Sequence, residues 1–270
     1  MPTTRTDLDE AIEGLGLTGR PVCLHVSFRS FDGLEGGPDS LLDAFLDRGG
    51  TVMALTLSYA FASAPPATGI YARNGGDETA FPFASGPVYD PASNVLNAEM
   101  VGVVPKAILA RTGRVRGDHP RSSFAAVGPG ARDLIAPQTP LDVFAPLREL
   151  VRLGGAVVLM GVGLDRMTLL HTAEQAAGRE PFHRWANGPA GTAIEVREGG
   201  CSSGFGALGA ALDPLARRRT VGGSPWTCYD AGAALAAATE AIRLRPELTR
   251  CGDPLCRDCP DAVAGGPIAR

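Results

Sequence analysis

The stretch GAVVLMGVGLDRMTLLHTAEQAAG, residues 155–178, decides the fold because a glycine turn joins the most apolar run of the chain to a helical pattern. The run 155–163 predicts a buried strand, and residues 169–177 predict a helix capped by Asp165 or Thr168. A glycine turn permits close approach of the backbone to a ligand. A strand followed directly by a helix indicates an α/β protein, in which ligands bind at the carboxyl ends of strands.

His171 lies about one turn inside this predicted helix. It can be a core histidine beside a glycine turn and a helix cap, or it can be a proton-handling group. An imidazole titrates near neutral pH and can take a proton from an amine or hydroxyl nucleophile. Glu174 follows His171 by one helical turn, and Asp165 precedes His171 by six residues. The spacing alone does not choose between these carboxylates as the partner of His171.

The same alternation of strands and helices extends outward along the chain. Residues 20–28 predict a strand, residues 40–49 a helix capped by Asp39 or Ser40, and residues 50–58 a second strand. Such a unit places its two strands parallel. The remaining predicted elements are a helix at 97–112, a strand at 122–128, helices at 130–136 and 144–154, a strand near 192–198, a helical stretch near 204–216 and a helix at 230–243.

We therefore predict one α/β domain over residues 1–270, with a central mixed, largely parallel sheet flanked by helices. Residues 1–180 form the core, and residues from about 181 to 270 form a smaller C-terminal lobe. The net charge of −4 argues against a nucleic-acid partner and permits a cationic substrate. No signal peptide or membrane-spanning run is found, which predicts a cytoplasmic protein.

The C-terminal tail carries a cluster of cysteines. Cys256 and Cys259 form a CxxC pair, and Cys251 lies five residues before it. Three thiolates and a fourth ligand make a closed tetrahedral zinc site, with Cys201 as the first candidate for the fourth ligand and Cys228 as the alternative. Such a zinc would be structural, pinning the tail to the second lobe. The alternative is a set of free thiols on a poorly ordered tail.

Three segments, at 24–45, 118–131 and 161–174, together resemble the aminoglycoside 3-N-acetyltransferase family, whose members do not share the GNAT fold. The residues that carry this resemblance are His25, Ser27, Arg29, Gly36, Gly37, His119, Pro120, Ser123, Phe124, Gly128, Gly161, Gly163, Asp165, Thr168, His171, Ala173 and Glu174. The sequence departs from the family at Val26, usually Ser, and at Met167, usually Asn.

The resemblance implies transfer of an acetyl group from acetyl-CoA to the 3-amino group of a 2-deoxystreptamine ring, with His171 as the general base. Its carboxylate partner would be Asp165 or Glu174, which lie near it in the sequence. Glu198 is a third candidate, because Ser203 stands where several relatives have an acid. The resemblance also assigns cofactor binding to two segments of the chain. The residues implied in contact with CoA are Ser27, Arg29, His119, Ser123 and Phe124.

An aminoglycoside carries several positive charges, so its cleft should be acidic. The long segment 60–98, rich in Pro, Gly and aromatic residues, is the expected source of acceptor specificity. The expected acceptor-binding carboxylates in and just after this segment are Asp77, Glu78, Asp90 and Glu99.

The resemblance also bears on the cysteine tail. Some apramycin-acetylating relatives end in a similar cysteine pair, which supports the zinc interpretation.

Two other functions remain open at this point. The chain could acylate another natural-product amine, or it could be a catalytically silent relative that binds its ligand without turnover. The serine at position 203 keeps the second of these open. A zinc hydrolase is disfavoured because the sequence has no HExxH-type motif. We expect small-molecule partners only, and a monomer or a homodimer.

Overall fold

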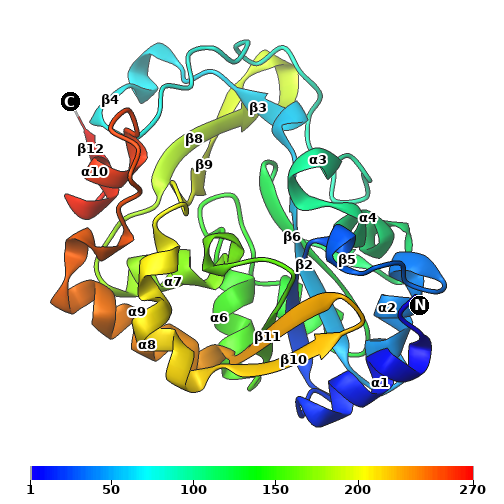
Figure 1. Ribbon diagram of the computed structural model, residues 1–270. Helices are drawn as coiled ribbons and strands as arrows, with labels where there is room; N and C mark the ends of the chain where they lie inside the picture. The colour runs from blue at the N-terminus through cyan, green and yellow to red at the C-terminus, as the bar shows by residue number, and fades with distance from the viewer. Residues whose placement is uncertain (1, 270) are drawn as a thin grey trace.

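The structure is a computed structural model that describes residues 2–269. Its centre is a seven-stranded sheet with the order β10-β11-β7-β1-β2-β6-β5 (Figure 1). The three central strands are β7 (Ala156–Met160), β1 (Pro21–Val26) and β2 (Thr51–Leu57), and they are parallel. All five residues of β7 are buried, as expected for a strand covered on both faces.

The outer strands are added antiparallel to this centre. On one side β11 (Ser224–Asp230) pairs with β7, and β10 (Arg217–Val221) forms the edge. On the other side β6 (Ser122–Val127) pairs with β2, and β5 (Val115–Arg116) forms the edge. Both edge strands therefore run in the direction of the central three, and only β11 and β6 are reversed. The prediction of a mixed sheet in which most strands share one direction is confirmed.

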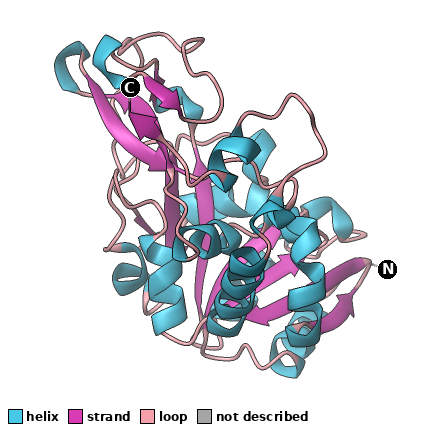
Figure 2. Ribbon diagram, turned by 90° about the vertical axis from the view of Figure 1, so that its left-hand side faces the viewer, coloured by secondary structure: helices cyan, strands magenta, loops and turns pink. Residues whose placement is uncertain are grey.

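Helices cover both faces of this sheet (Figures 1 and 2). One face packs against α1 (Arg5–Gly14), α2 (Gly37–Leu46) and α4 (Val103–Ala110). The other packs against α5 (Ala131–Ile135), α6 (Ala145–Arg152), α7 (Leu169–Ala176) and α9 (Ala231–Leu244). No helix among residues 2–269 has the length and apolar character that a membrane span requires.

Glycines correct two of the predicted helix boundaries. Helix α2 begins earlier than predicted, because Gly36 takes the cap position with a φ of +74° that favours glycine, so neither Asp39 nor Ser40 is the cap. The predicted helix at 97–112 is broken at Gly102, whose φ is +81°, into α3 (Ala98–Val101) and α4. In α7 the cap position belongs to Thr168, without a side-chain capping bond.

The C-terminal region from residue 181 has two parts. Strands β8 (Phe182–Asn187) and β9 (Ala193–Glu198) form a second sheet with β3 (Ala62–Ser63), and β4 (Tyr71–Arg73) pairs with β12 (Ile268–Ala269). Strands β10 and β11 and helix α9 return to the main sheet. The small sheets stand at one end of the molecule, beyond the main sheet (Figures 1 and 2).

Short helices connect these elements. Their bounds are η1 Phe28–Ser30, η2 Tyr59–Phe61, η3 Ala67–Gly69, η4 Leu164–Arg166, η5 Pro189–Gly191, η6 Phe205–Leu208, α8 Gly209–Leu212, η7 Asp213–Leu215, η8 Pro246–Thr249 and α10 Asp258–Val263.

Candidate active site

The carboxyl ends of β1 and β7 lie side by side and carry two of the predicted motifs. The N–H of Ser27 donates to the carbonyl of Met160, which joins the end of β1 to the end of β7 (2.9 Å). Gly161 has a φ of +65°, and a Cβ there would overlap the side chain of Ser30. The glycine therefore lets the turn after β7 pack against η1 before the chain enters α7.

Helix α7 places His171 beside Glu174. Nδ1 of His171 lies 2.8 Å from Oε2 of Glu174. The other carboxylate oxygen, Oε1, accepts from Nη1 of Arg179 at 2.5 Å. Arg179 also donates to Thr249 Oγ1 at 2.7 Å. The side chains of Glu174 and Arg179 are only 11% and 7% exposed, so the carboxylate between imidazole and guanidinium is held in one orientation.

Two aromatic rings and a glycine fix the imidazole plane. Phe144 stacks on His171 with the centroids 5.8 Å apart and the planes 13° from parallel. Phe205 meets the imidazole edge-on at 4.8 Å. A Cβ on Gly199 would lie 2.7–2.9 Å from three imidazole atoms, so the chain can pass there only with a glycine. The ring is therefore confined on several sides before any ligand binds.

This geometry fixes the proton on His171. A carboxylate only accepts hydrogen bonds, so Nδ1 carries the proton and donates it to Glu174. Nε2 is then the basic nitrogen, and it has no hydrogen-bond partner among the residues described by the structure. A neutral imidazole with a carboxylate behind it is the arrangement of a general base, because the carboxylate stabilises the imidazolium that forms.

The other two carboxylates suggested as partners lie elsewhere. The side chain of Asp165 is 46% exposed and pairs with Arg166 at 3.4 Å. Glu198 is buried on β9, where it accepts from Ser122 Oγ at 2.6 Å and pairs with Arg121 at 2.9 Å. Within residues 2–269, no hydrogen bond or ion pair joins either carboxylate to His171.

Arg121 connects Glu198 to the long segment 60–98. Its side chain is 1% exposed and forms a bidentate pair with Glu78, one bond of which is 3.0 Å. Its guanidinium also lies over the rings of Tyr59 and Phe81, at 5.3 and 5.5 Å from their centroids. Glu78 thus meets a buried arginine, and its charge is compensated within the protein.

His119 is fully buried with both ring nitrogens bonded to the backbone. Nδ1 accepts from the N–H of Ser122, and Nε2 donates to the carbonyl of Arg197, both at 2.9 Å. Burial lowers the pKa of His119. This histidine is therefore neutral and ties the start of β6 to the end of β9.

The residues implied in CoA binding divide into two groups. Ser27 and Arg29 lie at the carboxyl end of β1, and Arg29 is exposed. Ser123 is fully buried, and its hydroxyl is bonded to Thr56 Oγ1 at 2.7 Å and to Arg116 Nε at 2.9 Å. Phe124 is fully buried in the core. The structure thus places Ser27 and Arg29 at the carboxyl end of the central strand β1, whereas His119, Ser123 and Phe124 are buried within the protein.

The remaining acidic residues of the long segment stay at the surface. Asp77 and Asp90 each accept the backbone N–H two residues further on, from Thr79 and Ala92, at 2.8 Å. Glu99 is exposed on α3. The structure does not gather the four expected acceptor-binding carboxylates into one cluster.

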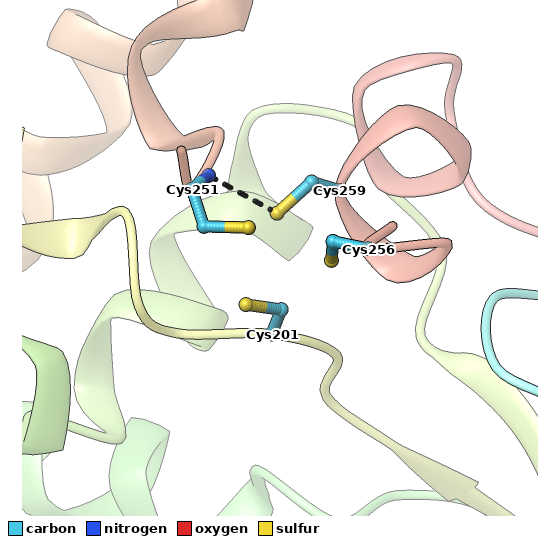
Figure 3. Close-up of side chains that lie close together, drawn as sticks. All are labelled: Cys201, Cys251, Cys256 and Cys259. Atoms are coloured by element: carbon cyan, nitrogen blue, oxygen red, sulfur yellow. Dashed lines mark hydrogen bonds between the residues drawn. The ribbon is translucent and has the colours of Figure 1, made fainter. Parts of the chain in front are cut away.

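Four cysteines converge as the sequence suggested, with Cys201 rather than Cys228 as the fourth member. The Sγ atoms of Cys201, Cys251, Cys256 and Cys259 all lie within 4.8 Å of one another (Figure 3). A tetrahedral zinc with Zn–S bonds of about 2.3 Å needs sulfurs about 3.8 Å apart. The N–H of Cys251 donates to Sγ of Cys259 at 3.3 Å. These residues therefore fit a zinc ion.

Sequence reasoning missed the groups that hold the base in place. Arg179 follows Glu174 by five residues, beyond the end of α7, so helical spacing does not connect them. Phe144 and Phe205 come from segments 27 residues before and 34 residues after His171. The glycine pair at 199–200, directly after a predicted strand, was the one sequence signal that a backbone segment passes close to another group there.

Comparisons with known proteins identify the family of the chain. The model of the family described as aminoglycoside 3-N-acetyltransferase matches residues 23–243. Aminoglycoside N(3)-acetyltransferase VIII of Streptomyces fradiae is 36% identical over 188 residues, which cover 65% of this chain and 62% of that relative. The chain thus matches less than two thirds of the relative's length.

Two solved structures share the fold. Apo aminoglycoside acetyltransferase AAC(3)-IVa is 25% identical, with a TM-score of 0.78 over 98% of both chains. AAC-IIIb in a binary complex with CoASH is 25% identical, with a TM-score of 0.73 over 90% of this chain and 97% of that one. Because the family match covers most of the sequence, the chain belongs to the aminoglycoside 3-N-acetyltransferase family.

Proposed function

We propose that the protein transfers an acetyl group from acetyl-CoA to the 3-amino group of a 2-deoxystreptamine aminoglycoside, with His171 as the general base. The observation that carries this proposal is the bond from His171 Nδ1 to Glu174, which leaves Nε2 as the basic nitrogen. The acceptor amine arrives as an ammonium ion and must lose a proton before it attacks. A neutral imidazole is suited to accept that proton at neutral pH.

The reaction then proceeds with a simple balance of bonds. Nε2 of His171 takes a proton from the ammonium, and the freed amine attacks the thioester carbonyl. The new C–N bond forms, the C–S bond breaks, and CoA leaves as a thiolate. The nitrogen loses a second proton as the amide forms. Of the two protons, one reaches the thiolate by way of the imidazolium, and the other is released to water. Glu174 stabilises the imidazolium while it exists, and Arg179 holds Glu174 in position.

Glu174 is our choice of partner for His171 among the three carboxylates. Asp165 is exposed beside Arg166, and Glu198 is bonded to Arg121 and Ser122. We assign Glu198 a positioning role: through its bond to Ser122 it holds the first residue of β6 against the end of β9. With Glu174 as the partner of His171, the chain needs no acid at position 203, where Ser203 is exposed in the turn after β9.

CoA binding is assigned to the carboxyl ends of the central strands β1 and β7. Ser27 and the exposed Arg29 lie there, and a guanidinium suits phosphate oxygens. His119, Ser123 and Phe124 act from beneath, by fixing the neighbouring strand β6. The complex of the relative AAC-IIIb with CoASH supports a CoA site in this fold. The reaction belongs in the cytoplasm, where acetyl-CoA is available.

A structural zinc held by four thiolates is the second part of the proposal. Cys201 follows β9, and the other three cysteines belong to the C-terminal tail (Figure 3). Four thiolates leave no open position for a substrate, so the metal would cross-link the two segments and take no part in the transfer. This zinc would stabilise the fold because it joins residues 50 or more positions apart.

A panel of amines tests the proposed function. Purified protein is mixed with acetyl-CoA and a set of aminoglycosides, including apramycin, and release of the CoA thiol is followed. Release with one or more 2-deoxystreptamine aminoglycosides, with the product acetylated at the 3-amino group, supports the proposal. Release only with other amines indicates a different acceptor, and binding without release indicates a catalytically silent relative.

A further inference from the structure

Cys201 belongs to a segment that packs on the imidazole of His171. It follows Gly199 by two residues, and a Cβ on Gly199 would lie 2.7–2.9 Å from three imidazole atoms. Phe205, four residues after Cys201, is fully buried and meets the same ring edge-on at 4.8 Å between centroids. We call residues 199–205 the glycine segment. A displacement of this segment therefore changes the space in which the imidazole is held.

Cys251 ends a second segment, which holds the carboxylate behind the base. Thr249, two residues before Cys251, is 3% exposed, and its hydroxyl accepts a hydrogen bond from Nη1 of Arg179 at 2.7 Å. The same hydroxyl donates to Oε1 of Glu174 at 3.4 Å. We call residues 246–251 the threonine segment. A displacement of this segment therefore moves the groups that orient Glu174.

The two segments touch each other beside the cysteine cluster. A Cβ on Gly204 would overlap the backbone of Thr249 and Arg250, so the glycine segment packs closely on the threonine segment there. Within residues 2–269, no backbone hydrogen bond joins the two segments. The Sγ atoms of Cys201 and Cys251 lie within 4.8 Å of each other and of the other two cluster sulfurs (Figure 3). A metal held by these sulfurs would add a bonded cross-link to a contact that otherwise depends on packing.

The backbone on the cluster side of each segment has no regular structure of its own. Residues 199–204 follow the end of β9 as an irregular loop, and residues 250–257 form only turns and bends. Such a backbone lacks the hydrogen-bond ladder of a helix or strand and is displaced at a low cost in free energy. The relative position of the two segments should therefore depend on what cross-links them.

We propose that the cysteine cluster positions the catalytic base. A zinc ion bound there holds the glycine segment against the threonine segment, and this contact fixes His171 relative to Glu174. Cys201 and Cys251 are positioning residues, because they act through the two segments, and no step of the transfer passes through the metal. This inference rests on the proposed function, and it adds an effect on kcat to the effect of the metal on stability.

Removal of zinc from the wild-type protein tests the inference directly. A cavity of about 500 Å³ opens onto Cys201, Cys251 and Cys256, so a chelator can reach the sulfurs. The tautomer of His171 is read by ¹⁵N NMR in mildly alkaline buffer, and its signals are assigned by their loss in His171→Gln. With zinc we expect one tautomer, with the proton on Nδ1. Without zinc we expect exchange between both tautomers, and added zinc should restore the single form.

Kinetics of the same preparations measure the consequence for the reaction. With an aminoglycoside that the panel shows to be accepted, kcat should fall at least about tenfold on removal of zinc, since a misplacement of about 1 Å can cost about 10²-fold. The KM for acetyl-CoA should stay unchanged, because CoA is assigned to the ends of β1 and β7, outside both segments. Re-addition of zinc should restore kcat.

A destabilised variant separates positioning from a general loss of stability. Leu42→Ala opens a cavity in the core on the opposite face of the main sheet, where Leu42 is fully buried. This variant should lower the Tm and keep both the single tautomer and the kcat of the wild type. A mixed tautomer in Leu42→Ala would show that any loss of stability has the same effect, which would contradict the assignment to the cluster.

Two neighbouring glycines test the contact without changing a cysteine. Gly204→Ala adds a Cβ that overlaps the backbone of the threonine segment, and we expect a mixed tautomer and a kcat lower by about tenfold. Gly206→Ala is the matched control, because among the described residues its added Cβ meets open space. It should keep the tautomer and the kcat of the wild type.

The outcomes distinguish this inference from the proposed function. The inference is overturned by wild-type protein that contains no zinc, or by a tautomer and kcat that do not change when zinc is removed. It is also overturned if Gly204→Ala behaves as Gly206→Ala does. In each of these cases the release of CoA still supports the proposed function. Absence of CoA release with every aminoglycoside overturns the proposed function, and the tautomer of His171 still reports on the effect of the cluster.

Discussion

Glu174 lies one helical turn after His171, with its Oε2 2.8 Å from Nδ1 of the imidazole. Its other oxygen meets Arg179, which is held by Thr249 and by the carbonyl of Pro246. The chain thus builds a buried imidazole–carboxylate–guanidinium series from α7 and the η8 region. This series gives the imidazole one tautomer and one orientation before substrate binds.

Replacing Glu174 with Gln should lower kcat about 10²-fold, because the imidazolium loses its stabilising charge. It should also lower the free energy of unfolding by about 3 kcal/mol, because Arg179 is left buried without a counter-charge. Kinetics and urea unfolding of the same preparations check both values. Asp165→Asn is the matched control, and its kcat should stay within about twofold because that carboxylate is exposed. A larger loss in Asp165→Asn than in Glu174→Gln would reverse the assignment.

Arg121 should be among the residues most important for stability. Arg121→Met leaves Glu198 buried without its partner, and we expect a loss of about 3–5 kcal/mol in the free energy of unfolding. Chemical denaturation measures this loss. Arg218→Met removes an exposed pair with Asp213 and should cost less than about 1 kcal/mol. Equal losses for the two variants would show that the buried network contributes no more than a surface pair.

Two histidines with lowered pKa values should make the fold sensitive to mild acid. Burial lowers the pKa of His25 to about 4 and also lowers that of His119, so both resist protonation in the folded chain. A histidine with a lowered pKa stabilises the fold above its unfolded pKa of about 6.5 and loses that contribution as the pH falls toward the folded value. Stability should therefore decline between about pH 6.5 and 4.

Thermal unfolding across this pH range checks the decline. His25→Gln should flatten the curve, since the amide does not titrate. Carboxylates with lowered pKa, such as Asp9 paired with Arg48, lose their contribution only below about pH 3.8, so they do not account for a decline near pH 5. A flat stability curve for the wild type from pH 7 to 5 would contradict the prediction.

Zinc should copurify with the chain in a one-to-one ratio. Cys256→Ser should lower the zinc content and the Tm, because a zinc bound by the folded chain adds its binding energy to folding. Cys228→Ala is the control: its thiol is buried on β11 beside Arg217, away from the cluster, and zinc content should stay the same. Elemental analysis of freshly purified protein measures both. Freshly purified wild-type protein that contains no zinc would contradict the metal assignment.

The centre of the fold could be predicted because its signals are local. The apolar run at 156–160, the helical spacing around His171 and the strand–helix–strand unit at 20–58 each depend on neighbouring residues. The outer strands gave weaker signals. Strand β10 is mostly exposed and rich in arginine, so it lacks an apolar pattern, and its pairing with β11 is a property of the tertiary fold.

The site divides in the same way. His171 and Glu174 share one helix, so their spacing placed them within reach, and the CxxC pair identified the cysteine tail. The spacing did not show that Asp165 pairs with the adjacent Arg166. It also did not show that Glu198 meets Arg121, because that pair forms across the fold. Ser123 and Phe124 lie on a strand buried on both faces, which a motif does not reveal.

The central claim is that His171 is the base of an acetyl transfer, and the release of CoA thiol by matched variants tests it most directly. We predict that the wild type releases thiol with acetyl-CoA and at least one 2-deoxystreptamine aminoglycoside. His171→Ala should retain the fold, as judged by circular dichroism, and lose at least about 10²-fold in kcat. Folded His171→Ala protein with a kcat within about threefold of the wild type would contradict the account, because general-base catalysis contributes far more than that.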